Sequence, residues 1–163
     1  MTPDWLRTHA ARHVEMIESL DLAAVEKAVA MLADARDRGR IVFACGNGGS
    51  AASASHLSVD LGKCASLGRA KRFRVVSLVE NVAWITAIAN DAGYENVFVE
   101  QMAGLASPGD VLVAISVTGS SPNVVKAAEY GSALGMTIVA LTGPAGGRLA
   151  ELADHVFGAY ESP

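Results

Sequence analysis

Apolar and polar residues follow two different periods along the chain, and the period changes near residue 40. Over the first forty residues, apolar side chains such as Leu6, Val14 and Ile17 recur every three or four positions, which predicts amphipathic helix. Asp21 is a favourable N-cap for a second helix over residues 22–38, and Gly39 is a typical helix end. Because both helices precede any strand, we expect them to cover the sheet or a neighbouring subunit.

After residue 40 the apolar residues come in short uninterrupted runs. The runs typical of strands buried on both faces lie at residues 41–45, 74–79, 111–116 and 136–142, with a fifth strand indicated at 156–157. Segments of helical pattern lie between them, at residues 51–64, 82–89, 95–106 and 122–134. Strands and helices alternate without a hairpin signal. The pattern therefore predicts an α/β fold, a doubly wound parallel sheet with two N-terminal helices.

The composition is that of a folded domain. Of the 163 residues, 51% are hydrophobic and 18% charged, so the chain is not intrinsically disordered. We expect a single domain over residues 1–163, with a helical pair at 1–39 and an α/β core at 40–163. The mean hydropathy of +0.30 is high for so short a chain, which indicates surface buried between the subunits of a homo-oligomer.

Charge and hydropathy also argue against several partners. The formal net charge is -4 and no long basic block occurs, so nucleic acid is not expected as a partner. No run of roughly 18 apolar residues is free of charge or glycine, and the N-terminus lacks the features of a signal peptide, so no membrane partner is expected. Cys45 and Cys64 have no metal-ligand spacing and are interpreted as reduced thiols of a cytoplasmic protein.

Two strand-to-helix turns are rich in glycine and hydroxyl residues. In a parallel sheet, ligands bind beyond the carboxyl ends of the strands, where both turns are expected. Each turn places backbone N–H groups at a helix N-terminus, which favours an anion. Neither turn contains Lys or Arg, so its neutral donors suit a phosphate monoester that must bind and leave. The candidate binding residues are Asn47, Gly48, Gly49 and Ser50 in the first turn, and Ser116, Thr118, Gly119, Ser120 and Ser121 in the second.

Two other interpretations of these turns stay open. Ser and Thr ahead of a helix are often only N-caps. Gly46, Gly48 and Ala51 also fit the G-x-G-x-x-G/A dinucleotide fingerprint, with Glu80 after the second strand as its acidic residue. However, Glu80 lies further along than the usual ~20 residues, and the fingerprint ignores the Ser-rich second turn. We therefore expect no nucleotide cofactor.

Behind the first turn, His56 and Asp60 are spaced i and i+4, which places them on one helix face. By itself, His56 is a proton donor, a metal ligand or a histidine satisfied in the interior, and Asp60 is a base or a solvated carboxylate. Together, beside a phosphate-binding turn, they suggest an acid–base or metal-binding pair. A basic cluster at residues 69–74 is either a solvated loop or a cationic rim that attracts phosphorylated substrate.

These motifs resemble those of the SIS (sugar isomerase) domain family, specifically of the phosphoheptose (sedoheptulose 7-phosphate) isomerases. The likeness rests on residues 46–50 followed by His56, on residues 86–94 and on residues 114–124. It implies a flavodoxin-like three-layer α/β/α fold and homotetramers whose active sites lie between subunits. It also implies a cytoplasmic enzyme whose partner is a phosphorylated sugar.

The resemblance assigns roles to the candidate residues. It implies that the second turn, with Ser116, Thr118 and Ser121, holds phosphate, that Asn47 and Ser50 contact substrate, and that Asp91 lines the site. His56 matches a zinc ligand, and Asp60 falls where the family has a glutamate that serves as base and ligand. The implied reaction interconverts sedoheptulose 7-phosphate and D-glycero-D-manno-heptose 7-phosphate through an enediol.

The chain departs from the family pattern at three places. Asp60 is one methylene shorter than the family glutamate, and Val117 replaces a hydroxyl residue. The chain stops at Pro163, where the family continues into a C-terminal helix with a glutamine and a catalytic histidine. Two hypotheses therefore accompany that of an isomerase. One is a non-catalytic SIS module that binds a phosphosugar or a protein partner such as a replication initiator, and the other is a nucleotide-dependent enzyme.

Overall fold

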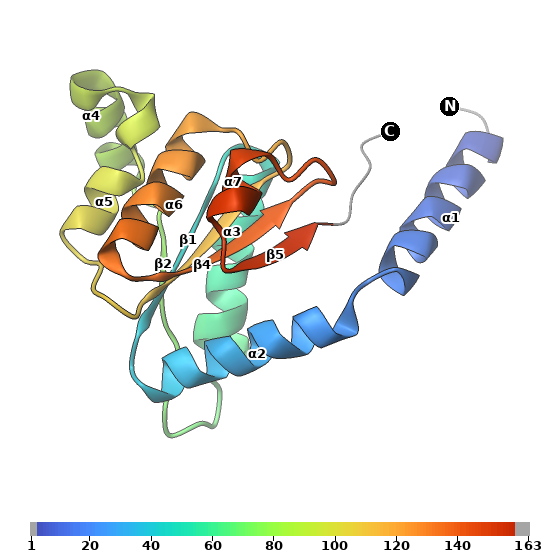
Figure 1. The fold of residues 1–163 in the computed structure, drawn as a ribbon, viewed down its shortest axis with the longest axis horizontal. Helices are drawn as coiled ribbons and strands as arrows, with labels where there is room; N and C mark the ends of the chain where they lie inside the picture. The colour runs from blue at the N-terminus through green and yellow to red at the C-terminus, as the bar shows by residue number, and fades with distance from the viewer. Residues whose placement is uncertain (1–2, 159–163) are drawn as a thin grey trace.

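A computed structural model describes residues 3–158 of the chain (Figure 1). Its helices are α1 (Pro3–Glu18), α2 (Leu22–Asp37), α3 (Gly49–Val59), α4 (Val82–Ala92), α5 (Val99–Ala103), α6 (Pro122–Leu134) and α7 (Gly147–Leu152). A π-helical turn, η1 (Asp60–Cys64), continues α3, and a 3-10 turn, η2 (Tyr94–Asn96), follows α4. The strands are β1 (Ile41–Gly46), β2 (Arg74–Ser77), β3 (Val111–Ser116), β4 (Thr137–Thr142) and β5 (His155–Gly158).

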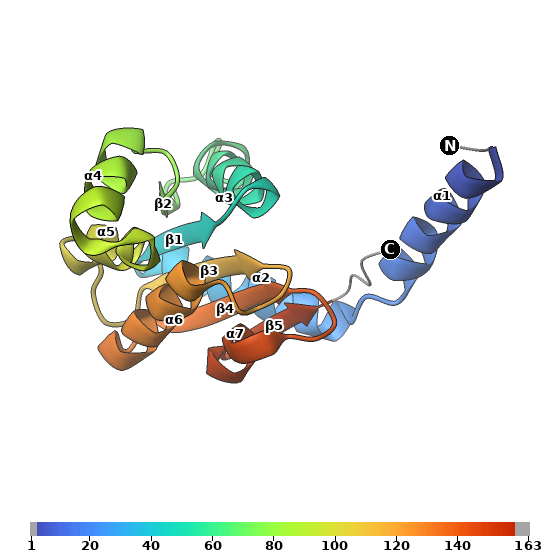
Figure 2. The same cartoon turned by 90° about the horizontal axis from the view of Figure 1, so that it is seen from above.

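The strands form a five-stranded sheet in the order β2-β1-β3-β4-β5, and all four neighbouring pairs are parallel. This is the flavodoxin-like order of a doubly wound sheet. Helices α2 and α3 cover one face, and α4 to α7 cover the other (Figure 2). The predicted fold class, a parallel α/β sheet with helices on both sides, is confirmed.

The central strands explain why the sheet is covered on both sides. Successive side chains of a strand point to opposite faces. Val42 and Ala44 of β1 pack with Ala35 of α2 and Ala54 of α3, whereas Phe43 packs into the cluster of the opposite face. Because both faces need apolar residues, the run is uninterrupted rather than alternating, as expected for a buried parallel strand.

The two N-terminal helices behave differently from one another. The Asp21 carboxylate accepts hydrogen bonds from the backbone N–H groups of Ala23 and Ala24, which confirms the predicted N-cap of α2. The end of α2 packs on the sheet through Ala35, whereas α1 projects away from the sheet (Figures 1 and 2). Only α2 therefore covers the sheet of its own chain as expected.

The predicted helix over residues 95–106 is wrong in extent. The chain instead forms the 3-10 turn η2 and the short helix α5, because Val97 and Phe98 between them are both drawn into the core. Gln101 is buried as well, and its side-chain amide donates to the carbonyls of Leu78 and Val97. Tertiary burial thus overrides the local helical pattern here. Across residues 3–158, every helix is too short or too polar to span a lipid bilayer.

Candidate functional site

The two glycine- and hydroxyl-rich turns lie side by side at the carboxyl edge of the sheet. They follow β1 and β3, which are neighbours with Gly46 paired to Ile115. From β1 the chain crosses to β2 on one side, and from β3 it crosses to β4 on the other. The turns therefore stand at the topological switch point, where doubly wound sheets bind ligands.

The first turn needs glycine where the strand becomes a helix. A Cβ on Gly46 would lie 2.8 Å from the backbone of Ser50, because the chain folds back at once. Gly48, with φ of 54°, occupies a conformation that side chains disfavour. No side chain caps the N-terminus of α3, although Ser50 stands in its first turn. The capping interpretation therefore does not describe this turn.

The second turn holds its hydroxyl groups in pairs. The Oγ atoms of Ser116 and Ser121 lie 3.2 Å apart, and those of Thr118 (Oγ1) and Ser120 lie 3.0 Å apart. Helix α6 then begins with Pro122, and the side chain of its N-cap residue Ser121 makes no capping hydrogen bond. The hydroxyls bond to one another rather than to the helix, so a ligand oxygen can take their hydrogen bonds.

A third turn, between β4 and α7, braces the second one. The backbone N–H of Gly143 donates to the Val117 carbonyl at 2.8 Å, and that of Leu149 donates to the Gly119 carbonyl at 2.8 Å. Gly119 has φ of 64°, and a Cβ there would overlap the carbonyl oxygen of Gly146. The backbone of the second turn is thus fixed by its neighbour as well as by its own strand.

Side-chain amides join the first turn to the second. Asn47 and Asn123 exchange two hydrogen bonds of 2.8 Å, and the Tyr94 hydroxyl donates to Asn47 Oδ1 at 3.0 Å. Asn123 is only 2% exposed. The three residues come from the end of β1, the turn after α4 and the start of α6.

A cleft of about 570 Å³ opens beside this amide pair. Its lining residues are Asn47, Tyr94, Glu95, Ser121, Pro122, Asn123 and Lys126. Lys126 Nζ lies 3.1 Å from Asn96 Oδ1 and 3.9 Å from Glu95 Oε1. The two turns contain no charged side chain, whereas the cleft contains a cation, Lys126, and a carboxylate, Glu95.

Sequence reasoning did not assign Tyr94, Asn123 or Lys126 to the site. A signal was available for two of them, because Asn123 and Lys126 are spaced i and i+3 on the first turns of the helix that follows the hydroxyl-rich turn. Tyr94 ends the 86–94 segment of the family resemblance, but no local pattern indicates its contact with Asn47. Its place depends on the packing of a segment 47 residues away from Asn47.

His56 and Asp60 do meet as their spacing predicts. Nε2 of His56 lies 3.2 Å from Oδ2 of Asp60, and the side chains are 78% and 51% exposed. Asp60 begins the π-helical turn, a distortion common at functional sites. His56 lies two helical turns beyond Gly49, about 10 Å along the axis. The pair does not line the cleft of its own chain.

The same pair does not by itself fit a zinc site. Catalytic zinc takes three protein ligands and leaves one position open. Within residues 3–158, His, Cys, Asp and Glu side chains form no group of three or more that could hold a metal. His56 and Asp60 supply two ligands, and a third is needed from outside this set.

Asp91 is an exposed residue near the end of α4. Its Oδ1 accepts a hydrogen bond of 2.7 Å from the side-chain amide of its neighbour Asn90. Asp91 is not among the residues that line the cleft. The predicted place of Asp91 in the site therefore stays a prediction.

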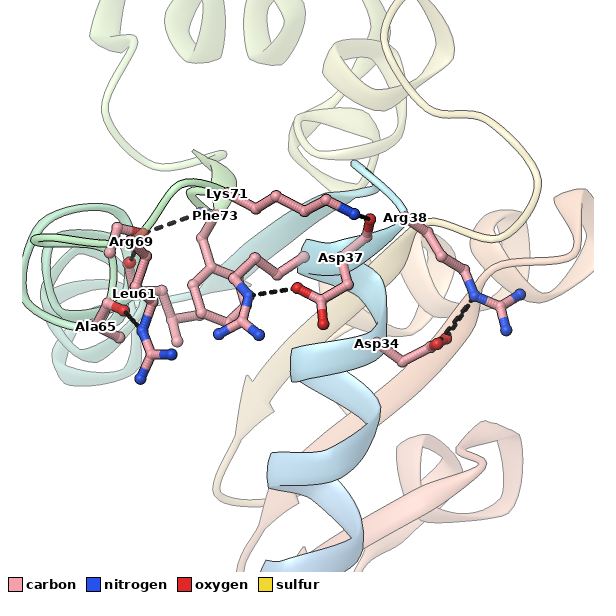
Figure 3. Close-up of polar contacts among 10 residues, drawn as sticks. Asp34, Asp37, Arg38, Leu61, Ala65, Arg69, Lys71 and Phe73 are labelled. Carbon is pink, nitrogen blue, oxygen red and sulfur yellow. Dashed lines mark hydrogen bonds and ion pairs between the residues drawn. The ribbon is translucent and has the colours of Figure 1, made fainter.

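The basic cluster lies at the opposite edge of the sheet, where the strands begin. Lys71 donates to the Asp37 carbonyl at 2.6 Å and Arg69 to the Ala65 carbonyl at 2.8 Å (Figure 3). Arg74, the first residue of β2, donates to the Gly39 carbonyl at 2.9 Å. These cations hold backbone carbonyls at the ends of helices, and they do not rim the cleft of the same chain.

Cys45 comes just before the first turn but takes no part in its chemistry. Its side chain is fully buried in β1. Burial raises the pKa of the Cys45 thiol to about 12, because the thiolate would lose its hydration. The thiol is therefore protonated near neutral pH and is a packing residue rather than a nucleophile.

Comparisons with known proteins agree with this arrangement. A family model of the SIS domain matches residues 5–143. The phosphoheptose isomerase of Alteromonas mediterranea is 43% identical over 136 residues, which make up 80% of this chain and 66% of that relative. The chain thus spans about two thirds of the length of the curated relatives that it matches.

Solved structures of phosphoheptose isomerases share the whole fold. GmhA from Neisseria gonorrhoeae superposes with a TM-score of 0.83 at 32% identity, covering 98% of this chain and 86% of its own. The enzyme from Francisella tularensis gives a TM-score of 0.88 at 28% identity, covering 98% and 84% of the two chains.

Proposed function

Because the chain belongs to the SIS domain family, we propose that it is an aldose–ketose isomerase for a phosphorylated seven-carbon sugar. The proposed reaction converts sedoheptulose 7-phosphate into D-glycero-D-manno-heptose 7-phosphate. The observation that carries the proposal is the pair of uncapped turns, rich in hydroxyl and amide groups, at the switch point of the sheet. The 43% identity to a phosphoheptose isomerase supports this choice of substrate over other phosphosugars.

The two turns are assigned to the phosphate group. A phosphate monoester offers only acceptor oxygens near neutral pH, and the turns offer donors. Ser116, Thr118 and Ser121 contribute hydroxyls in the second turn. The N-terminus of α3 contributes the positive end of its helix dipole, although the backbone N–H groups of Ser50 and Ala51 already donate to the Asn47 carbonyl. Binding by neutral donors holds the dianion while allowing the product to leave.

The proton transfers are assigned to Asp60 and His56. The Asp60 carboxylate takes a proton from C1 of the ketose while His56 gives a proton to the C2 oxygen, which forms the enediol. The carboxylic acid then returns its proton to C2, and the C1 hydroxyl proton passes back to His56, which leaves the aldehyde at C1. A positioned acid–base pair contributes about 10²–10⁴-fold in rate.

We further propose that the active form is a homo-oligomer, most simply a tetramer. In one chain His56, in α3, and Asp60, at the start of η1, are exposed to solvent, and a neighbouring subunit would bring such a pair to a second cleft. Apolar side chains are exposed on the projecting helix α1, including Leu6, Val14 and Ile17 at 55%, 53% and 62%. Such a stripe on a helix that leaves its own sheet is typical of a surface buried by another chain.

The oligomer has a direct test. Ile17→Asp places a charge in the exposed stripe and is expected to reduce the assembled mass measured by light scattering. Glu18→Ala, a change at the neighbouring exposed position, is the matched control and should leave the mass unchanged. A wild-type protein that remains monomeric at micromolar concentration would refute the assembly.

The isomerase is tested by aldose formation from sedoheptulose 7-phosphate with the full-length protein. Asp60→Asn should lower kcat by about 10²–10⁴-fold, because Asp60 transfers the protons at C1 and C2. Binding of inorganic phosphate should stay near normal, because the phosphate is assigned to the two turns and not to Asp60. Asp34→Asn, which changes an exposed carboxylate paired with Arg38, is the control. Sugar phosphate binding without aldose formation would instead identify a non-catalytic module. A thermal shift with NAD but none with sugar phosphates would identify a nucleotide enzyme.

A further inference from the structure

The side-chain amides of Asn47 and Asn123, between the two turns, belong to a hydrogen-bond network in which each donor and acceptor is defined. The backbone N–H of Val124 donates to Asn123 Oδ1 at 3.0 Å, and Asn47 Nδ2 donates to the same oxygen at 2.8 Å. Asn123 Nδ2 donates back to Asn47 Oδ1 at 2.8 Å, and the Tyr94 hydroxyl donates to that oxygen at 3.0 Å. The chain runs from a helix backbone to the wall of the cleft.

The direction of this chain is set by the backbone. A backbone N–H can only donate, so the Asn123 atom that faces Val124 must be the carbonyl oxygen. The Asn47 atom that faces the same oxygen must then be its nitrogen, and the other two amide atoms follow. A flip of either side chain would bring two oxygens or two NH₂ groups together, and Asn123 is too buried for water to compensate.

The arrangement leaves defined groups for a ligand. Asn47 Oδ1 already accepts two hydrogen bonds, which is its full capacity, and Nδ2 has used one of its two hydrogens. What Asn47 still offers to the cleft is one N–H donor. Tyr94 has used its hydroxyl proton, so its oxygen remains as an acceptor.

We propose that Asn123 and Tyr94 are positioning residues that hold Asn47 as a hydrogen-bond donor toward the ligand. The cleft then selects a carbonyl, hydroxyl or phosphate oxygen opposite Asn47 and a hydroxyl group opposite Tyr94. This inference rests on the proposed function, because a sugar phosphate presents both kinds of group. Asn123 itself does not touch the ligand and acts through Asn47.

The kinetic test uses the isosteric change Asn123→Asp, which keeps an acceptor for Val124 but cannot donate to Asn47. We expect KM for sedoheptulose 7-phosphate to rise about tenfold, with kcat within about threefold, because a binding contact of the substrate is misaligned. Asn47→Ala should raise KM to a similar extent. The double variant Asn47→Ala/Asn123→Asp should be within about twofold of Asn47→Ala alone, since Asn123 acts through the missing side chain.

Controls separate this role from a structural one. Asn81→Asp makes the same chemical change at the exposed N-cap of α4, where a carboxylate still accepts from Trp84, and should leave KM unchanged. Tyr94→Phe should raise KM less than Asn123→Asp, because the amide pair survives. An unchanged KM for Asn123→Asp, or effects that multiply in the double variant, would overturn the proposal.

A second readout does not depend on turnover. In nuclear magnetic resonance spectra of the full-length wild-type protein, the side-chain NH₂ protons of Asn47 should exchange slowly with solvent. In Asn123→Asp, the chemical shifts of these protons should move toward the values of a free amide. Unchanged Asn47 signals would overturn the positioning role even in an active isomerase. If the wild type makes no aldose, the proposed function fails, while these spectra and their response to inorganic phosphate still decide the role of Asn123.

Discussion

Replacing Gly119 by alanine should displace the backbone of the second turn, which we propose binds phosphate. Gly119 has φ of 64°, and a Cβ there would overlap the carbonyl oxygen of Gly146 in the bracing turn. The turn cannot simply move aside, because the Gly119 carbonyl accepts a hydrogen bond of 2.8 Å from Leu149 and its N–H donates to Ser116 at 3.0 Å. A single methyl group therefore opposes both the backbone conformation and the contact between the turns.

The size of the effect follows from these two costs. The left-handed conformation costs a residue with a Cβ about 1–2 kcal/mol. Forcing a methyl group into packed surroundings adds about 1–3 kcal/mol. A total of about 3 kcal/mol lowers Tm by roughly 6–12 °C in a domain of this size.

Thermal unfolding followed by circular dichroism measures this change. Gly104→Ala is the matched control, because Gly104 has a right-handed helical conformation with nothing within 4 Å of an added Cβ, and its Tm should stay near that of the wild type. Affinity for inorganic phosphate should fall in the Gly119 variant alone. A Gly119→Ala protein with wild-type Tm and wild-type phosphate affinity would refute the idea that the brace shapes the turn.

Two further predictions concern charge. Lys126→Gln should raise KM for the sugar phosphate about tenfold and weaken the salt dependence of KM, because Lys126 is the cation that lines the cleft. Arg148→Gln, outside the cleft, is the control and should change neither quantity in the same assay. Burial raises the pKa of Cys45 from its ordinary 9.0 to about 12. Above pH 9 the unfolded chain therefore binds fewer protons than the folded one. The free energy of unfolding thus falls as the pH rises toward 12. Urea titrations at pH 8 and pH 10.5 should show this loss in the wild type and a smaller loss in Cys45→Ala. An equal loss of unfolding free energy in the two proteins would show that the Cys45 thiol does not cause it.

The fold could be predicted because its signals are local. The central strands are uninterrupted apolar runs, and β3 and α6 fall at the predicted residues 111–116 and 122–134. The helix predicted over 95–106 failed because the burial of Val97 and Phe98 is a tertiary effect that the helical period does not encode.

In the candidate site, too, local features could be predicted and tertiary contacts could not. The glycine and hydroxyl pattern identified both turns, and the i, i+4 spacing identified the contact between His56 and Asp60. The Asn47–Asn123 pair joins residues separated by 76 positions, and no local pattern reports such a contact. The surface position of His56 and Asp60 likewise depends on how α3 leaves the sheet and on what covers it.

We propose that the two neighbouring turns together hold the phosphate group of a sugar phosphate. A crystal structure of the full-length protein with sedoheptulose 7-phosphate tests it most directly. We expect phosphate oxygens within hydrogen-bond distance of the Ser116, Thr118 and Ser121 hydroxyls, with the sugar in the cleft beside Asn47. A sugar phosphate bound elsewhere, with its phosphate away from both turns, would contradict it.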